Sequence, residues 1–309
     1  MVTRVTTPGN YAAILSNLLA AQGRQVEAGN KVATQKNGND LKDYAKSSEL
    51  LTAMRTVQTR LDAFQEQSKL LGDKLQTQDT GLVRVKDAAA AVRQIYSEAI
   101  ASGRVDTLVE DIQAQLSNAA EGLNSRYGGK YLFAGGQVDT RPVTATTLAQ
   151  LTAGPPIASF FQNDQFRVTA KLDEATTVTT GLLASDIGTE MLTAFQSFQA
   201  FNEGANGPFV GQMTDAQRVF HEGQLAVWDD VRSDVTNLAA YNGTNQKRLD
   251  TVAEDLVGRQ NALAGMIGDI TDADMAQAAA ELQTAQLSVQ SAAYVFQALR
   301  ESSLLEVLR

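Results

Sequence analysis

The stretch LLTAMRTVQTRLDAFQEQSKLLGDKLQTQDTGLVRVKDAAAAV, residues 50–92, decides the fold of this chain. Steps of four and three residues, taken in turn from Leu50 to Val92, land on apolar side chains except at Ser68 and Gln78. An apolar seam with a period of 3.5 residues, kept over about six heptads, is typical of a coiled-coil helix. We therefore expect one long helix over residues 50–101, and this helix needs an equally long partner.

The second half of the chain offers that partner. From Trp228 to Ile270, steps of three and four residues give a second seam, interrupted by Asn242, Asn245 and Arg259. The five prolines leave residues 9–141 and 209–309 without one, and an interior proline would cost a helix about 3 kcal/mol. We expect the two helices to form an antiparallel rod. The predicted rod core consists of Val57, Leu61, Phe64, Leu71, Leu75, Leu82, Val235, Leu249, Val252, Leu256, Leu263 and Met266.

The middle of the chain has a different composition. It is crowded with threonine, contains the turn Pro155-Pro156, and includes the alternating run QFRVTAK at residues 165–171. Such patterns favour short strands and turns. The predicted fold class is therefore mainly α, a long antiparallel coiled-coil rod built from both termini, with a small β-rich inserted domain. The predicted division is an N-terminal assembly helix and spoke (1–45), the first half of the rod (46–135), the β-rich insertion (136–190), the second half of the rod (191–270) and a C-terminal assembly helix (271–309).

The last segment carries apolar residues on several faces. Its seam runs from Met275 through Val289 to Leu299, and further apolar side chains lie off that seam. A helix of this kind needs cover, either from copies of the chain and the N-terminal segment or within one large domain. The predicted assembly interface comprises Leu15, Leu18, Met275, Leu282, Val289, Phe296, Leu299, Leu304, Leu305 and Leu308. We expect Val289→Asp or Phe296→Asp to leave the rod folded and to block assembly.

Composition excludes several classes of protein. The net charge of −9 and the lack of basic runs argue against nucleic acid as a partner. With no cysteine, the chain has neither disulfides nor thiolate metal sites. No run of about 18 apolar residues is present to span a membrane, and the first residues lack the apolar core of a secretory signal.

The sequence offers no site for catalysis or for a metal. His221-Glu222 begins like the helix motif of zinc proteases, but Leu225 stands where the second histidine should be, and His221 is the only histidine. We expect His221 to be structural. Nucleophilic and acid/base catalysis both lack candidates, so we predict no catalytic, cofactor-binding or metal-binding residue, no cofactor and no enzyme activity.

Two other patterns have structural interpretations. Gly128-Gly129-Lys130 lacks the first glycine and the closing hydroxyl residue of a phosphate loop, because Asn124 and Tyr131 occupy those positions. The acidic group in DITDAD, residues 269–274, lacks the glycine and ligand spacing of a calcium loop. A role at the start of the last helix is the expected one.

Four stretches resemble the flagellin family. QVEAGNKV (25–32) followed by NGND (37–40) is similar to that family's helix, glycine break and loop, with alanine in place of the usual serine before the glycine. DITDADMA (269–276) resembles the acidic hinge before its terminal helix, and SSLLEVL (302–308) resembles its closing segment. LNSRYGGKYLFAGG (123–136) is similar to the corresponding segment of hook-associated members of the family.

The resemblance implies a structural protein of the bacterial flagellum. It implies export through the flagellar type III channel, a location outside the cell, and self-assembly through the terminal helices as an adaptor at the hook-filament junction. The implied partners are copies of the chain in a ring, a neighbouring hook-associated protein, flagellin and an export chaperone. A filament flagellin is the alternative, and a binding module or enzyme unrelated to flagella is a third.

Overall fold

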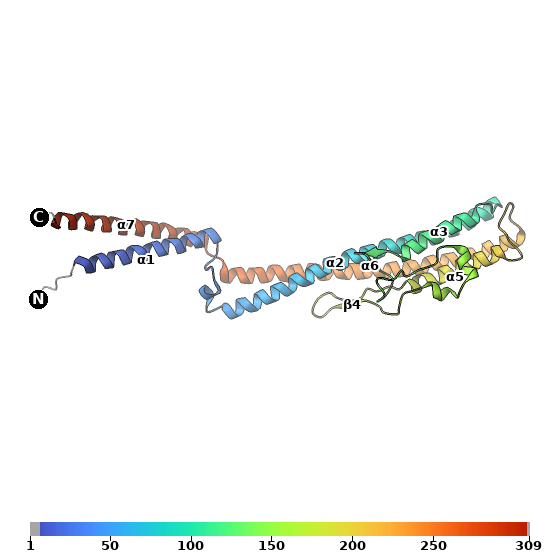
Figure 1. Ribbon diagram of the computed structural model, residues 1–309, viewed down its shortest axis with the longest axis horizontal. Helices are drawn as coiled ribbons and strands as arrows, with labels where there is room; N and C mark the ends of the chain where they lie inside the picture. Colours follow the sequence, from blue (N-terminus) through green and yellow to red (C-terminus); the bar gives the residue numbers. More distant parts are fainter. Residues whose placement is uncertain (1–6, 308–309) are drawn as a thin grey trace. The chain divides into compact units, whose positions relative to one another are not determined.

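The computed structural model describes residues 7–307, and the side chains of residues 12–298. The chain forms two compact units, one of residues 1–61 and 258–309, the other of residues 62–257. Helices predominate in both (Figure 1). The helices are α1 (Thr7–Thr34), η1 (Leu41–Tyr44), α2 (Ser48–Ser102), α3 (Leu108–Leu123), α4 (Leu148–Ala153), η2 (Ile157–Phe160), α5 (Ala184–Glu203), α6 (Asp215–Thr271) and α7 (Met275–Val307).

The strands form two small hairpins. β1 (Arg126–Tyr127) pairs antiparallel with β2 (Lys130–Tyr131), and β3 (Thr169–Lys171) pairs antiparallel with β4 (Thr177–Thr179). Gly128 and Gly129 connect the first pair with positive φ angles of 57° and 81°. Glycine adopts such angles without steric cost, so this sequence forms a tight hairpin turn.

In the second unit, α2 and α6 lie antiparallel. Asn242 Nδ2 donates to the main-chain oxygen of Leu75, and Arg93 Nε lies 2.8 Å from Asp229 Oδ1 further along the pair. Residue numbers on α2 therefore rise as those on α6 fall. The predicted long helices are both present, and each is continuous over more than fifty residues.

Three of the polar residues that interrupt the two seams, Gln78, Asn242 and Asn245, form hydrogen bonds between elements. Gln78 Nε2 donates to the main-chain oxygen of Thr180, and Asn245 Nδ2 to that of Thr179. Below the β3–β4 hairpin, Leu172 and Val178 pack with seam residue Leu75 in one apolar cluster. These side chains thus fix the hairpin on the helix pair.

The main core of the second unit lies where α3 and α5 cover the α2–α6 pair. Its largest fully buried side chains include Tyr96, Phe195, Phe198 and Trp228, and the ring centroids of Phe195 and Trp228 are 4.8 Å apart. His221 belongs to the same core. Its ring is fully buried, 5.0 Å from that of Tyr96 and 4.9 Å from that of Phe209, and burial lowers its pKa to about 4.

The residues predicted for the rod core differ in burial. Leu71, Leu75, Leu82, Val235, Leu249, Leu256 and Leu263 are buried, and Leu61, Phe64 and Val252 are half-buried. Val57 and Met266 are 38% and 47% exposed, so the prediction that they form the core is wrong for a single chain. Both lie in the ends of α2 and α6 that belong to the first unit. A seam pattern identifies the apolar face of a helix, but burial requires a partner that covers it.

The predicted β-rich insertion contains little strand. Between residues 136 and 190 the structure has the two three-residue strands β3 and β4, the short helices α4 and η2, and the start of α5. Several threonines there serve other purposes: Thr147 begins α4 with a capping box, and Thr144 Oγ1 donates to the oxygen of Phe160. Threonine suits turns and helix starts as well as strands, which is why its abundance overstated the strand content.

Candidate assembly surface

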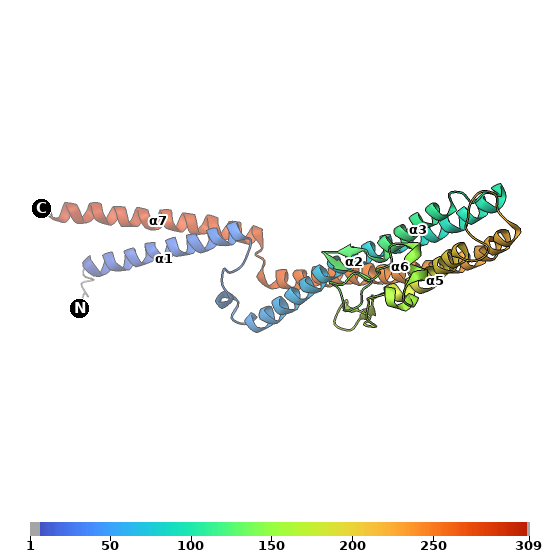
Figure 2. The same cartoon turned by 45° about the vertical axis from the view of Figure 1, so that its right-hand side comes forward.

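The first unit pairs α1 with α7. Both views show the two helices running side by side (Figures 1 and 2), and the ion pair between Lys31 Nζ and Glu281 Oε2, 3.2 Å, together with the approach of Gly29 to Leu282, makes them antiparallel. Alanines line the contact at heptad spacing. The buried ones are Ala21 and Ala28 on α1 and Ala278 and Ala285 on α7. Small side chains at these positions allow the two helices to approach closely.

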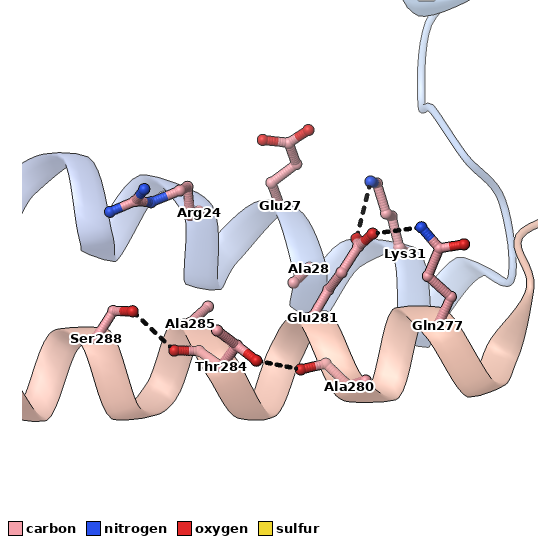
Figure 3. A pocket seen from close by; sticks show the side chains of 10 residues that line it. All are labelled: Arg24, Glu27, Ala28, Lys31, Gln277, Ala280, Glu281, Thr284, Ala285 and Ser288. Atoms are coloured by element: carbon pink, nitrogen blue, oxygen red, sulfur yellow. Dashed lines mark hydrogen bonds and ion pairs between the residues drawn. The ribbon is translucent and has the colours of Figure 1, made fainter.

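One side of this pair forms a groove of about 460 Å³ (Figure 3). Its floor is made of small side chains, including Ala28, Ala280 and Ala285. Four charged residues line it, namely Arg24, Glu27, Lys31 and Glu281. Glu281 accepts hydrogen bonds from Gln277 and Lys31, which hold the pKa of its carboxyl below the usual range.

Over a long part of the α1–α7 pair, these four residues are the only charged ones in the sequence. The sequence of α1 has no other charged residue, and α7 has none between Glu281 and Arg300. The remaining faces are therefore neutral and partly apolar. Their exposed large apolar residues are Leu15 (46%), Leu19 (58%) and Val26 (63%) on α1, and Leu287 (62%), Tyr294 (74%) and Val295 (51%) on α7. Surfaces of this kind on helices typically contact other proteins.

The segment after α1 (residues 35–40) and the junction between α6 and α7 (residues 271–274) are hydrogen-bonded to each other. Asn37 N donates to the oxygen of Thr271, and Ala273 N donates to the oxygen of Gln35. Lys36 forms an ion pair with Asp272, and its hydrogen bond is the main cause of the lowered pKa of that carboxyl. These contacts hold the segment that follows α1 against the segment that precedes α7.

The acidic stretch before α7 has the role expected of it. Asp274 Oδ1 accepts hydrogen bonds from the backbone N–H groups of Ala276 and Gln277. A carboxylate in this position satisfies backbone donors that a helix start would otherwise leave without partners. The stretch DITDAD thus ends one helix and begins the next.

The structure divides the ten predicted interface residues into three groups. Leu15 and Met275 are exposed. Leu18, Leu282, Val289 and Phe296 are half-buried, and the last three share the stripe of Ala278 and Ala285 that faces α1 of the same chain. The side chains of Leu299, Leu304, Leu305 and Leu308 lie outside the described residues.

The predicted interface left out the exposed residues off the seam, although the sequence shows apolar side chains on those faces. A heptad count selects the side chains that pair two helices, whereas Leu19, Val26, Leu287 and Tyr294 lie on other faces. The available signal was the run of residues 282–299, which has no charge on any face. An uncharged helix of this length is expected to be covered on more than one side.

Comparisons with known proteins agree with this arrangement. Residues 225–308 match a family model described as the bacterial flagellin C-terminal helical region. The chain has a flagellin-type C-terminal region. This match includes the acidic hinge at residues 269–276 and most of α6 and α7, and it confirms the resemblance inferred from those residues. Comparison with curated proteins gave no match.

Solved structures share the fold, among them the following two. A structure described as a flagellar hook-associated protein from Vibrio parahaemolyticus is matched over 74% of this chain and 100% of that chain, with a TM-score of 0.62 and 15% sequence identity. FlgL from Bacillus cereus is matched over 71% of this chain and 99% of that chain, with a TM-score of 0.53 and 13% identity. The chain therefore shares its fold with these two structures, and the predicted mainly α fold class is confirmed.

Two kinds of feature are absent from the described residues. No helix within them has both the length and the hydropathy for crossing a membrane. No group of three or more His, Asp or Glu side chains in the same part of the chain is placed to hold a metal ion.

Proposed function

We propose that the chain is a structural subunit of the bacterial flagellum, located at the hook-filament junction, where it joins the hook to the filament. The observation that carries this proposal is the α1–α7 pair. Its faces off the charged groove are neutral and expose Leu19, Leu287 and Tyr294. Such a surface suits lateral contact among many copies, because each copy can cover the exposed apolar residues of its neighbour.

The comparisons support the junction over the filament. Two of the matched structures are described as a flagellar hook-associated protein and as FlgL, and each is matched over nearly its whole length. The segment YLFAGG at residues 131–136 resembles hook-associated members rather than filament flagellins. In this role the partners are copies of the chain in a ring, a neighbouring hook-associated protein and flagellin, with an export chaperone before secretion. A filament flagellin is the second candidate.

Labelling at a single cysteine tests the location. The chain has no cysteine, so Ala175→Cys places one reactive thiol in the exposed turn between β3 and β4. The Ala175 N–H donates to Asp173, and the substitution keeps this backbone contact. Isolated flagella carrying the variant would be treated with a maleimide gold label and viewed by electron microscopy, with wild-type flagella as the control without a thiol.

The three outcomes have distinct meanings. A narrow band of label where the hook meets the filament is the expected result. Label along the whole filament would identify a flagellin instead. Absence of label from every flagellum, with the variant expressed and folded, would refute a flagellar function.

A further inference from the structure

The second unit has another groove, between α5 and α6. Two adjoining hollows of about 260 and 300 Å³ share Glu190 and Val231 in their linings. The residues that α6 contributes recur every three or four positions from Gln224 to Leu238, so the groove follows the helix. Apolar side chains, such as Ile187 and Val231, line it together with acidic ones.

Of the four acidic side chains of this groove, Asp186 pairs with Arg167 at 2.7 Å, and the other three have no paired cation among the described residues. Within the described part of the chain no Lys or Arg pairs with Glu190, Asp230 or Asp234. The hydrogen bond with Asp234, and then the charges of Asp234 and Asp230, raise the pKa of the Glu190 carboxyl. The groove is therefore a negative surface whose charges repel one another, and a cation would relieve this repulsion.

The opposite side of α6 has an excess of positive charge at the same level. Arg93 Nε lies 2.8 Å from Asp229 Oδ1, and Arg232 donates to the same oxygen at 3.3 Å. Two guanidinium groups thus share one carboxylate, which leaves a net charge of about +1. Both arginine side chains are substantially exposed, at 41% and 50%.

Helix geometry fixes the relation between these two surfaces. Arg232 lies two residues from Asp230 and two from Asp234. Because successive residues turn by about 100°, positions two apart project about 160° from each other while differing by only about 3 Å in height. The second unit therefore carries opposite charges on opposite sides at one level.

We propose that the α5–α6 groove binds the Arg93–Arg232 surface of a second copy of this chain, standing beside it in the same orientation and at the same level. The contact joins two different surfaces, so it is heterologous, and repetition about an axis gives a ring or a helical array. Charge complementarity sets which sides meet and disfavours contact between two sides of like charge. The proposal rests on the proposed function, because it requires copies assembled side by side.

A charge swap tests the contact. Arg232→Glu and Asp234→Arg are each expected to reduce the number of copies in isolated flagella by about three- to tenfold, measured by quantitative immunoblot. In the double variant the two exchanged side chains attract each other again across the contact, while Glu190 and Asp230 keep their charges, so copy number should rise above that of either single variant without reaching wild type. Lys247→Glu and Asp250→Arg, exposed positions on the same helix, are the matched controls. Thermal unfolding of each purified variant verifies that the fold is intact.

Crosslinking tests the geometry independently of stability. Cells would express Arg232→Cys and Asp234→Cys chains together, or either alone, and flagella would be treated with a short bismaleimide. Crosslinked dimers are expected only when both variants are present. The proposed contact would be overturned by dimers from one variant alone, by no dimers from the mixture, or by a charge swap that fails to raise copy number. If wild-type chains are nevertheless present in flagella, the proposed function still stands. Absence of the wild-type chain from flagella would overturn both.

Discussion

Asn242 on α6 donates a hydrogen bond from Nδ2 to the main-chain oxygen of Leu75 on α2, with 3.0 Å between the two atoms. The side chain is 1% exposed and is one of three polar residues in the mostly apolar seam of α6. A buried amide needs a partner, and only one axial alignment of the two helices brings this donor to this carbonyl. Asn242 therefore fixes the register of the antiparallel pair, as polar seam residues do in other coiled coils.

Asn242→Ala is expected to lower the free energy of unfolding by about 1 to 3 kcal/mol, because the substitution removes the hydrogen bond and leaves a gap in the seam. Urea unfolding followed by circular dichroism measures the change. Asn237→Ala, an exposed position on the same helix, is the control and should change stability by less than about 0.5 kcal/mol. Equal stability of the two variants would show that the buried hydrogen bond contributes nothing.

The same residues show how far the sequence predicts the fold. The two long helices follow from the period of the apolar residues, which is a local property. The roles of Gln78 and Asn245 do not, because their acceptors, Thr180 and Thr179, are far away in sequence and meet them only after the hairpin has docked. On the candidate assembly surface, the heptad count found the residues that face α1 but not exposed ones such as Tyr294. Whether an apolar face is covered within one chain or between chains depends on tertiary contacts that periodicity does not report.

Because His221 is buried, the folded protein should lose stability in acid. Its pKa is lowered from 6.5 to about 4 by burial, so the folded chain binds fewer protons than the unfolded chain between these values. Stability is then fully present above pH 6.5 and falls as the pH decreases towards 4, by at most about 3 kcal/mol from this group. Because carboxyl groups contribute a common background, the comparison needed is with His221→Phe, which keeps an aromatic ring among Tyr96 and Phe209.

The measurement is urea unfolding at intervals from pH 7 to pH 4. The difference in stability between wild type and His221→Phe should change with pH over this range, in the direction that favours the variant in acid. A constant difference would mean that His221 titrates normally in the folded state.

Replacing Gly122 on α3 with alanine should destabilise the protein, which is the opposite of alanine's usual effect in a helix. A Cβ atom there would lie 2.8 Å from Val85 Cγ2 and 2.9 Å from the main-chain oxygen of Gly81, so α2 and α3 approach through two glycines. Gly122→Ala should therefore destabilise the protein by about 1 to 3 kcal/mol, although alanine is the better helix former by about 1 kcal/mol. The control is Gly223→Ala in α6, where nothing lies within 4 Å of the added atom. Thermal unfolding should show stabilisation of the control by about 0.5 to 1 kcal/mol, and stabilisation of both variants would refute the close approach.

A charged substitution at Tyr294 should impair assembly without disturbing the folding of the α1–α7 pair. This side chain is 74% exposed on α7, so Tyr294→Asp introduces no clash or buried charge within one chain. In an assembly that covers Tyr294, the same carboxylate would lose its water, and incorporation into flagella should fall by about tenfold or more. Tyr294→Phe keeps the apolar ring and should assemble normally.

Val289→Asp provides the contrast. This half-buried residue lies on the stripe of α7 that faces α1, so its carboxylate should weaken the pairing of the two helices within the chain as well as assembly. Limited proteolysis of the purified monomers distinguishes the two effects: Val289→Asp should make α1 and α7 more susceptible than in wild type, whereas Tyr294→Asp should not. If Tyr294→Asp were incorporated as well as Tyr294→Phe, the exposed face of α7 would not be an assembly surface, and contacts between copies would have to come from the charged groove or from the second unit.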